Sequence, residues 1–317
     1  MAEKDPSKKF EAAYLETYRK GLFQEKIDGA FRRLESCTIC PRRCGVNRFR
    51  GEKGVCEAGL ELEVSSSGPH FGEESPLVGR HGSGTIFFTH CNLRCSFCQN
   101  YSISHLGEGQ RLSYEGLAGM MVELQSLGCH NINFVSPSHY VPQILKSLPP
   151  AIEAGLSIPL VYNTGGYDGL ETLGFLEGVF DIYMPDFKFS QGRPAEEFCR
   201  APDYPQAAKT AIKEMHRQVG DLVLDEDGIA LRGLLVRHLV LPGGLAGTDE
   251  VMKFLAQELS KKTYVNIMDQ YHPCGDIDRS PLLSRRITAR EYQDAVDAAQ
   301  RAGLTRLDKR DRFRIVF

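Results

Sequence analysis

Apolar residues in the carboxyl-terminal three quarters of the chain follow a repeating two-part pattern. Short runs rich in β-branched and aromatic residues are separated by longer stretches with apolar residues at helical spacing. Nearly continuous apolar runs of this length are typical of strands buried on both faces of a parallel sheet, with helices as the connections. The pattern predicts strands over 85–90, 132–137, 158–164, 180–189, 234–241 and 263–271, and helices over 113–128, 141–155, 168–178, 205–220, 249–260 and 288–302.

Six strand-then-helix units in series predict an α/β fold with a parallel sheet and right-handed crossovers. A partial (β/α)6 barrel and a doubly wound sheet both fit this pattern, and in both the functional residues gather at the carboxyl ends of the strands. Thr288 and Glu291 form a capping box that predicts the start of the last helix. Polar and glycine residues directly follow the apolar runs, over 90–98, 136–140, 163–167, 186–188, 237–244 and 270–273.

The amino-terminal part of the chain has a different pattern. Residues 11–35 carry a loose helical period of apolar residues among many charges, which predicts an amphipathic helix with a break near Gly21. The stretch 37–56 is too poor in apolar residues to fold by burial alone, so a bound metal would have to organise it. We therefore predict a helix and four-cysteine metal-binding module over 1–60, a connecting segment over 61–84 and a core domain over 85–317.

Composition and charge narrow the class of protein. The chain has 317 residues, with 38 Lys and Arg against 41 Asp and Glu, for a formal net charge of -3. A charge this close to zero argues against a general nucleic-acid-binding protein, and no apolar run approaches the roughly 18 residues that span a bilayer. The first ten residues, MAEKDPSKKF, lack the apolar stretch of an export signal. We therefore expect a cytoplasmic protein in which disulfides are disfavoured.

Ten cysteines in such a chain need another explanation, and their spacing supplies one. Cys91, Cys95 and Cys98 directly follow the first predicted core strand, and three thiolates in one loop can bind three of the four irons of a 4Fe–4S cluster, leaving one iron open for chemistry. The alternative is a zinc knuckle completed by His90 or His105. Cys129, Cys199 and Cys274 stand alone and are expected to be inert, with a functional role left open for Cys274 near the end of the last predicted strand.

Cys37, Cys40, Cys44 and Cys56 supply four thiolate ligands at short spacing. Four thiolates can close a tetrahedral zinc site or bind a second 4Fe–4S cluster, and the spacing does not decide between the two. The module is also basic, which suits the docking of an acidic electron donor or of a protein substrate. An RNA-binding module is the other reading, although Phe49 is the one aromatic residue there for stacking on bases. The basic residues are Arg42, Arg43, Arg48, Arg50 and Lys53.

The spacing of the three-cysteine loop carries a family resemblance. The loop has the pattern C-x3-C-x-aromatic-C, with Phe97 as the aromatic residue, and resembles the radical S-adenosylmethionine (radical SAM) superfamily. The resemblance implies a partial (β/α)6 TIM-like barrel of radical SAM type, here with a small amino-terminal cysteine-rich metal module. It also implies a 4Fe–4S cluster whose open iron binds the amino and carboxylate groups of S-adenosylmethionine. An electron from the reduced cluster cleaves the sulfonium, giving methionine and a 5′-deoxyadenosyl radical that abstracts hydrogen from a substrate.

The resemblance extends over about residues 35–303 to the pyruvate formate-lyase activating enzymes. It implies an oxidoreductase that takes electrons from reduced flavodoxin or ferredoxin and abstracts hydrogen from a glycine of a partner protein, a glycyl radical enzyme. Modification of another protein, a peptide or a metabolite is the alternative enzymatic function, and an iron–sulfur or zinc RNA-binding protein is the non-enzymatic one. The sequence gives no role for one matching run, HFGEES. The matching runs are 37–48, 70–75, 82–100, 131–142, 181–189, 237–243 and 266–271.

Several strand-end residues correspond to cofactor-binding positions of these enzymes. After the second core strand the superfamily has Gly-Gly-Glu, where this chain has Pro137-Ser138-His139, so Ser138 and His139 are candidates to accept the ammonium of S-adenosylmethionine, with a packed loop as the alternative for His139. Arg237 corresponds to an arginine that pairs with the cofactor carboxylate, a planar anion that a guanidinium binds in a bidentate manner. A glycine turn is the alternative for Asn163, an exposed ion pair for Asp186 and Lys188, and a surface loop for His272. The remaining candidates for cofactor binding are Phe97, Asn163, Asp186, Lys188 and His272.

Overall fold

A mixed α/β fold around a central sheet of ten strands is seen in the computed structural model, which describes residues 10–277 and 280–308. The strands pair in the order β10-β9-β8-β6-β5-β4-β2-β1-β3, with β7 (Val223–Leu224) attached to β8. Every pairing from β2 to β10 along this path is parallel. The parallel strands are β2 (Ser83–Phe88), β4 (Ile132–Val135), β5 (Leu160–Thr164), β6 (Ile182–Pro185), β8 (Ala230–Leu239), β9 (Tyr264–Met268) and β10 (Arg306–Leu307).

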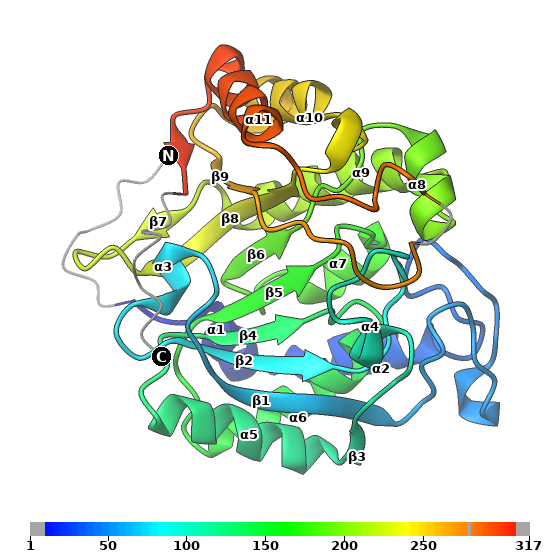
Figure 1. Ribbon diagram of the computed structural model, residues 1–317. Coiled ribbons are helices and arrows are strands. Elements are labelled where there is room, and N and C mark those ends of the chain that lie inside the picture. Colours follow the sequence, from blue (N-terminus) through cyan, green and yellow to red (C-terminus); the bar gives the residue numbers. More distant parts are fainter. Residues whose placement is uncertain (1–9, 278–279, 309–317) are drawn as a thin grey trace.

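Strand order in the sheet is the same as strand order in the chain for these parallel strands. A doubly wound sheet reverses its order near the middle, so this arrangement excludes the doubly wound alternative. In Figure 1, β2, β4, β5 and β6 point the same way, toward the side where α4 (Tyr101–Ser104) lies. All six predicted strands are confirmed, and β6 is shorter than the predicted 180–189 because the chain leaves regular pairing after Pro185, with one isolated bridge from Asp186 to Arg237.

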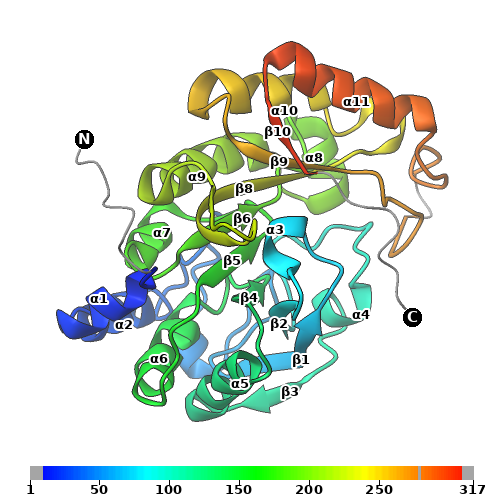
Figure 2. The ribbon, with the colours of Figure 1, turned by 90° about the vertical axis from the view of Figure 1, so that its left-hand side faces the viewer.

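The six predicted helices are also confirmed. In Figure 2 these six helices follow one another in an arc around the outside of the strands, so they cover the outer face of the sheet and not its inner face. Thr288 accepts a hydrogen bond from the backbone N–H of Glu291, and the Glu291 carboxylate accepts one from Thr288 in return, so the predicted capping box is present. No helix among residues 10–277 and 280–308 is both long enough and apolar enough to cross a bilayer. The helices are α5 (Tyr114–Ser126), α6 (Val141–Glu153), α7 (Leu170–Leu176), α9 (Tyr204–Val219), α10 (Thr248–Phe254), extended by the π-helical turn Leu255–Leu259, and α11 (Ala289–Ala302).

The amino-terminal helix is broken where the sequence predicts. Helices α1 (Ala13–Arg19) and α2 (Phe23–Arg32) are separated at Gly21, which has a φ of 67°, in the left-handed region that favours glycine. Helix α2 packs against α6 and α7. The carboxylate of Asp181, just before β6, accepts a hydrogen bond from the backbone N–H of Ala13 at 2.8 Å. The amino-terminal helices are therefore fixed to the outer helices and to the sheet.

Residues 61–84, predicted as a plain connection, form part of the sheet instead. Strand β1 (Leu62–His70) pairs antiparallel with β2 on one side and with β3 (Gln110–Leu112) on the other. The strand is half exposed and contains Ser65, Ser66 and Ser67, so it lacks the apolar pattern by which the other strands are recognised. The short helix α3 (Ser75–Val78) follows, and its Leu77 packs among apolar side chains of the parallel strands.

Candidate active site

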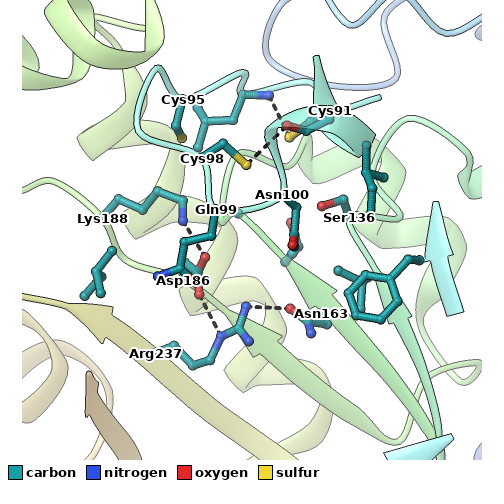
Figure 3. Close-up of a pocket in the computed structure, with 18 of the residues that line it drawn as sticks. Cys91, Cys95, Cys98, Gln99, Asn100, Ser136, Asn163, Asp186, Lys188 and Arg237 are labelled. Atoms are coloured by element: carbon teal, nitrogen blue, oxygen red, sulfur yellow. Dashed lines mark hydrogen bonds and ion pairs between the residues drawn. The ribbon is translucent and has the colours of Figure 1, made fainter. Parts of the chain in front are cut away.

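The three-cysteine loop lies at the carboxyl end of β2, as the sequence predicts for a functional loop. His90 and Arg94 have φ values of 65° and 49°, so two non-glycine residues occupy the left-handed region within this short turn. The turn brings the side chains of Cys91, Cys95 and Cys98 to one cavity of about 380 Å³ at the carboxyl edge of the sheet (Figure 3). The three cysteines and the strand ends therefore enclose the same space.

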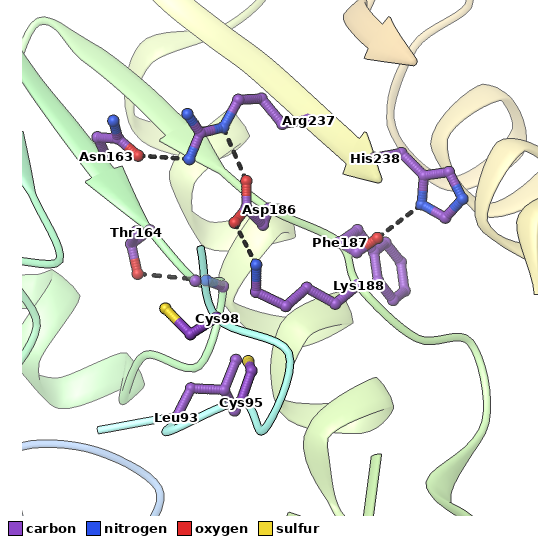
Figure 4. Close-up of polar contacts among 12 residues, drawn as sticks. Leu93, Cys95, Cys98, Asn163, Thr164, Asp186, Phe187, Lys188, Arg237 and His238 are labelled. Carbon is purple, nitrogen blue, oxygen red and sulfur yellow. Dashed lines mark hydrogen bonds and ion pairs between the residues drawn. The ribbon is translucent and has the colours of Figure 1, made fainter. Parts of the chain in front are cut away.

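A chain of charged and polar side chains crosses the same cavity (Figure 4). Arg237 Nε donates to Asp186 Oδ1 at 2.7 Å, and Arg237 Nη2 donates to Asn163 Oδ1 at 2.6 Å. Lys188 Nζ donates to Asp186 Oδ2 at 2.5 Å, so one carboxylate bridges the two cations. Burial opposes the ionisation of Asp186, but the charges of Arg237 and Lys188 outweigh it and hold its pKa below the ordinary value. The cavity therefore holds fixed charges of both signs.

Glu73 and His70 also belong to this site, although no role for them could be derived from the sequence. Both line the cavity, as does Gly72. Glu73 Oε2 lies 3.8 Å from Arg237 Nη1, and Glu73 Oε1 lies 3.1 Å from His70 Nδ1. Burial alone would raise the pKa of Glu73, but the hydrogen bond with His70 and the charge of Arg237 together outweigh it. The pKa is therefore below its ordinary value, and the carboxyl is held in its charged form. The run HFGEES was the sequence feature that could have pointed to these residues. Its place at the cavity follows from strand β1, which ends at His70.

Ser138 and His139 do not line the cavity. Ser138 Oγ donates to Asp168 Oδ1 at 2.6 Å, and His139 Nε2 lies 2.9 Å from the carbonyl oxygen of Thr89. Burial lowers the pKa of His139 to about 3, so its imidazole is neutral. The residue of this loop that lines the cavity is Ser136. The structure therefore does not bring Ser138 or His139 together with the cysteines.

Phe97 and His272 are placed differently from each other. Phe97 lines the cavity, and its ring packs edge-on against the rings of Phe189, Phe198 and Tyr271. These contacts fix the position of the cysteine loop. His272 does not line the cavity, whereas Gln270 does. His272 Nδ1 lies 3.3 Å from the carbonyl oxygen of Gln270. Of the eight cofactor-binding candidates, five therefore line the cavity: Phe97, Asn163, Asp186, Lys188 and Arg237.

The four cysteines of the amino-terminal module also lie close together. The thiol of Cys56 interacts electrostatically with those of Cys37 and Cys44, and the thiol of Cys40 interacts with those of Cys37 and Cys56. Burial raises the pKa of Cys40 to about 12, with Cys56 adding to the rise. Among residues 10–277 and 280–308, however, no three His, Cys, Asp or Glu side chains converge on one position for a metal ion.

Two basic residues of this module are used inside the protein rather than on its surface. Arg48 is 1% exposed, and its guanidinium donates to the carbonyl oxygens of Gly59 at 2.9 Å and His139 at 2.8 Å. Arg42 donates to backbone carbonyls of the three-cysteine loop, among them that of Asn92 at 2.9 Å. Of the five basic residues of the module, Arg43, Arg50 and Lys53 are therefore the exposed ones that could contact RNA or an acidic partner.

Comparisons with known proteins place the chain in a family. No protein-family model matches the chain. The solved structures of native anSMEcpe with bound AdoMet and of its histidine-tagged form each align with 69% of this chain at 11% sequence identity, with TM-scores of 0.47 and 0.46. This chain covers 61% and 58% of those chains, less than two thirds of their length. The protein named "Uncharacterized protein MJ0674" from Methanocaldococcus jannaschii is 31% identical over 299 residues, which are 92% of this chain and 82% of that protein. This chain therefore belongs to the same family as that archaeal protein.

Proposed function

We propose that this protein is a radical SAM enzyme in which Cys91, Cys95 and Cys98 bind a 4Fe–4S cluster and S-adenosylmethionine is reductively cleaved in the adjoining cavity. The observation that carries the proposal is a single cavity lined by all three loop cysteines and by the charged pair Asp186 and Arg237. Three ligands from one loop leave one iron of such a cluster without a protein ligand. The sequential parallel sheet with helices outside it serves, on this proposal, as the partial barrel.

The donor set fits a cluster better than a single metal ion. A zinc ion needs its ligands at about 2.0 to 2.3 Å from one point, whereas each cysteine of a cluster binds a different iron. The loop cysteines line one cavity, yet no three candidate ligands among the described residues converge on a single-ion position. The zinc alternative also needs a histidine, and His90 Nε2 is paired with Glu63 Oε2 at 3.1 Å, while His105 Nδ1 lies 2.8 Å from Ser104 Oγ.

The charged residues of the cavity suit the amino acid part of S-adenosylmethionine. Burial disfavours the charged forms of Lys188 and Arg237, but Asp186 outweighs this and raises the pKa of both above their ordinary values, so both remain cations. On this proposal Arg237 binds the carboxylate of the cofactor and Asp186 accepts from its ammonium group. Such a cluster, when bound, supplies the electron that cleaves the sulfonium. The aromatic packing of Phe97 behind the loop helps to exclude water from it.

Anaerobic reconstitution with iron and sulfide, reduction with dithionite and chromatography for 5′-deoxyadenosine test this function. We expect product from the wild type and none above background from the triple variant Cys91→Ala, Cys95→Ala, Cys98→Ala. Cys129→Ala is the matched control, because Cys129 is a buried cysteine outside the cavity lining, and it should retain product formation. Equal product from the wild type and the triple variant would exclude the enzymatic function.

For the substrate, we propose hydrogen abstraction from a glycine of a partner protein, a glycyl radical enzyme. The support is the sequence resemblance to pyruvate formate-lyase activating enzymes over the matching runs, and the electron donor on this proposal is reduced flavodoxin or ferredoxin. A partner-dependent doublet in the electron paramagnetic resonance spectrum of a candidate partner tests it. Turnover of S-adenosylmethionine with no such doublet in any glycyl radical partner would point to another protein, a peptide or a metabolite.

For the amino-terminal module, we propose a second metal centre held by Cys37, Cys40, Cys44 and Cys56. The support is the mutual interaction of the four thiols in a segment with few apolar residues. Iron and zinc analysis with Mössbauer spectroscopy decides between a second 4Fe–4S cluster and zinc, by comparing anaerobically purified wild type with the double variant Cys37→Ala, Cys40→Ala. Equal metal content in the two proteins would contradict a centre at this module.

A further inference from the structure

Cys199, which stands alone in the sequence, touches a cysteine of the three-cysteine loop. It is the last residue of α8 (Gly192–Cys199), and its Sγ lies 3.2 Å from the Sγ of Cys95, 104 residues away in the chain. Both side chains are buried, Cys199 at 1% exposure and Cys95 at 7%. The contact therefore lies within the protein, directly beside the cavity.

The backbone around Cys199 is held from two directions. The N–H of Ser96, next to Cys95, donates to the carbonyl oxygen of Phe198 at 2.8 Å. From the amino-terminal module, Arg42 Nη2 donates to the carbonyl oxygen of Cys199 at 2.6 Å. Helix α8 ends here because Arg200 takes a left-handed conformation, with a φ of 51°. The backbone that carries the Cys199 thiol is thus held by hydrogen bonds to the loop and to the module.

Each sulfur of the three-cysteine loop has a hydrogen-bond donor beside it, and Cys91 and Cys98 each have a further backbone donor, from Arg94 and from Asn100. Cys91 Sγ accepts from the backbone N–H of Leu93 at 3.4 Å, and Cys98 Sγ lies 3.2 Å from Ser104 Oγ. Cys95 Sγ has the thiol of Cys199 in the corresponding role. Hydrogen bonds to the sulfurs of an iron–sulfur cluster stabilise its more negatively charged, reduced form and so raise its reduction potential.

Cys199 is the donor among these that can be removed most cleanly. The Leu93 donor belongs to the backbone, and Ser104 Oγ also lies 2.8 Å from His105 Nδ1, so its one proton is shared between two acceptors. The thiol of Cys199 has Cys95 as its hydrogen-bond partner. A thiolate bound to iron has no proton to give, so in the loaded protein the hydrogen bond runs from Cys199 to Cys95.

We propose that Cys199 is a positioning residue that donates a hydrogen bond to the Cys95 sulfur and thereby raises the reduction potential of the cluster. The proposal rests on the proposed function, because it requires a cluster at Cys91, Cys95 and Cys98. It assigns to Cys199 a role in setting how easily the cluster accepts an electron, without making it a ligand. The serine variant keeps a donor at the same place, whereas the alanine variant removes it.

A redox titration of the full-length, anaerobically reconstituted protein tests the role of Cys199. The signal followed is the electron paramagnetic resonance signal that changes on addition of S-adenosylmethionine and is absent from the Cys91→Ala, Cys95→Ala, Cys98→Ala variant. Cys199→Ala should lower the potential, giving about a tenfold smaller ratio of reduced to oxidised cluster at a fixed potential, or about 59 mV for a one-electron couple. Cys199→Ser should recover most of this shift, and the iron content per chain should stay that of the wild type.

Three results would overturn the proposal. An unchanged potential in Cys199→Ala would show that the contact does not affect the cluster. Equal shifts in the alanine and serine variants would show that thiol packing, not hydrogen bonding, is responsible. Loss of iron in Cys199→Ala would make Cys199 a ligand. If the wild type itself gives no signal that responds to S-adenosylmethionine, the proposed function fails as well, so the two failures are distinguishable.

The cluster-free protein offers a second test of the contact. Diamide, which takes up the two thiol hydrogens and is reduced to its hydrazine, should join Cys95 to Cys199 as a disulfide, because their sulfurs already lie 3.2 Å apart. Peptide mapping under non-reducing conditions should recover this pair, and Cys129, buried elsewhere, should remain a free thiol. Pairing of Cys95 with Cys91 or Cys98 in place of Cys199 would contradict the geometry on which the proposal rests.

Discussion

Arg42 and Asn92 join the two cysteine-rich parts of the chain: Arg42 Nε donates to the carbonyl oxygen of Asn92 at 2.9 Å. Arg42 lies between Cys40 and Cys44 of the amino-terminal module, and Asn92 follows Cys91 in the loop at the cavity. The guanidinium of Arg42 also donates to the carbonyl oxygens of Leu93 at 3.2 Å and Cys199 at 2.6 Å. The side-chain amide of Asn92 donates to the carbonyl oxygen of Tyr167 at 2.7 Å. The module and the loop are therefore one hydrogen-bonded unit.

Replacing Arg42 should loosen this unit. Arg42→Gln removes most of the donors to loop carbonyls, which leaves buried acceptors without partners, and we expect a loss of about 2 kcal/mol in stability. Differential scanning calorimetry at equal iron content should show a melting temperature lower by about 3 °C. Arg50→Gln, in the exposed part of the same module, is the control and should leave the melting temperature within about 1 °C. Equal effects of the two variants would contradict a coupling role for Arg42.

The geometry of Arg237 predicts that a lysine cannot replace it. Its Nε and Nη2 bind Asp186 and Asn163 at the same time, and a lysine ammonium cannot hold both in this planar arrangement. Arg237→Lys should therefore weaken S-adenosylmethionine binding by about tenfold, or about 1.4 kcal/mol, in anaerobic isothermal titration calorimetry of the reconstituted protein. The control is Arg232→Lys, whose guanidinium donates to the carbonyl oxygen of Gln218 outside the cavity. Unchanged affinity in Arg237→Lys would show that Arg237 does not bind S-adenosylmethionine.

The charged residues of the cavity could be predicted because position along parallel strands fixes where they lie. Asp186 and Lys188 lie two positions apart and so point to one face as the chain leaves β6. An isolated bridge places Asp186 beside Arg237 of the next strand in the sheet. Asn163 is the next-to-last residue of β5, on the other side of β6. Sequence pattern and strand order together therefore suffice to bring these four residues to one edge.

The loop after β4 could not be predicted in the same way, because its direction depends on a single backbone conformation. Ser136 has a φ of 56°, a conformation that no apolar pattern reveals. Beyond it the chain turns so that Ser138 donates to Asp168, a buried carboxylate that also accepts from Tyr162 at 2.9 Å and Thr164 at 2.6 Å. The expectation that Ser138 faces the cofactor followed from alignment with the superfamily pattern and carried no information about this turn.

Glu73 and Cys199 were missed because their roles arise from contacts between distant parts of the chain. Glu73 reaches Arg237, and Cys199 reaches Cys95, across more than a hundred residues in each case. No local period or spacing encodes such a contact, whereas the three-cysteine loop is encoded within eight residues. The half-exposed strand β1 was missed for a related reason, since its pairing with β2 and not its apolar content defines it.

Gly166 supports the cavity through a close backbone approach, which predicts opposite effects for two Gly→Ala variants. At Gly166, with a φ of 79°, an added Cβ would lie 2.2 Å from the carbonyl oxygen of Asp186, so Gly166→Ala should cost more than about 2 kcal/mol and displace Asp186. At Gly174, within α7, an added Cβ meets nothing within 4 Å, so Gly174→Ala should stabilise by about 0.5 to 1 kcal/mol. Chemical denaturation of the metal-free proteins measures both, and an unchanged or increased stability in Gly166→Ala would contradict the close approach at Gly166.

Asp181 is a buried carboxyl group at which the sheet and the amino-terminal helix meet. Its Oδ1 accepts from the N–H of Ala13 at 2.8 Å, and its Oδ2 accepts from the N–H of Leu160, the first residue of β5, at 3.2 Å. Burial raises the pKa of Asp181 to about 7, against the smaller opposing effects of these two N–H groups and of Arg232. The folded protein therefore holds a proton on Asp181 over a pH range in which the unfolded chain, with the ordinary value of 3.8, has lost it.

The consequence is that the contribution of Asp181 to stability falls as pH rises from about 4 to 7. A carboxyl whose pKa is higher in the folded state stabilises it fully below the unfolded value, and this contribution is lost as pH rises through the folded value, here over about three pKa units or up to about 4 kcal/mol. Urea denaturation of the metal-free protein from pH 4 to 8 should show this slope. Asp181→Asn cannot ionise, so its curve should be flatter in that range, and it should be offset downward because the amide places an N–H against one of the two backbone donors. The surface variant Asp297→Asn should keep the wild-type slope, and an unchanged slope in Asp181→Asn would show that Asp181 is ionised in the folded protein at neutral pH.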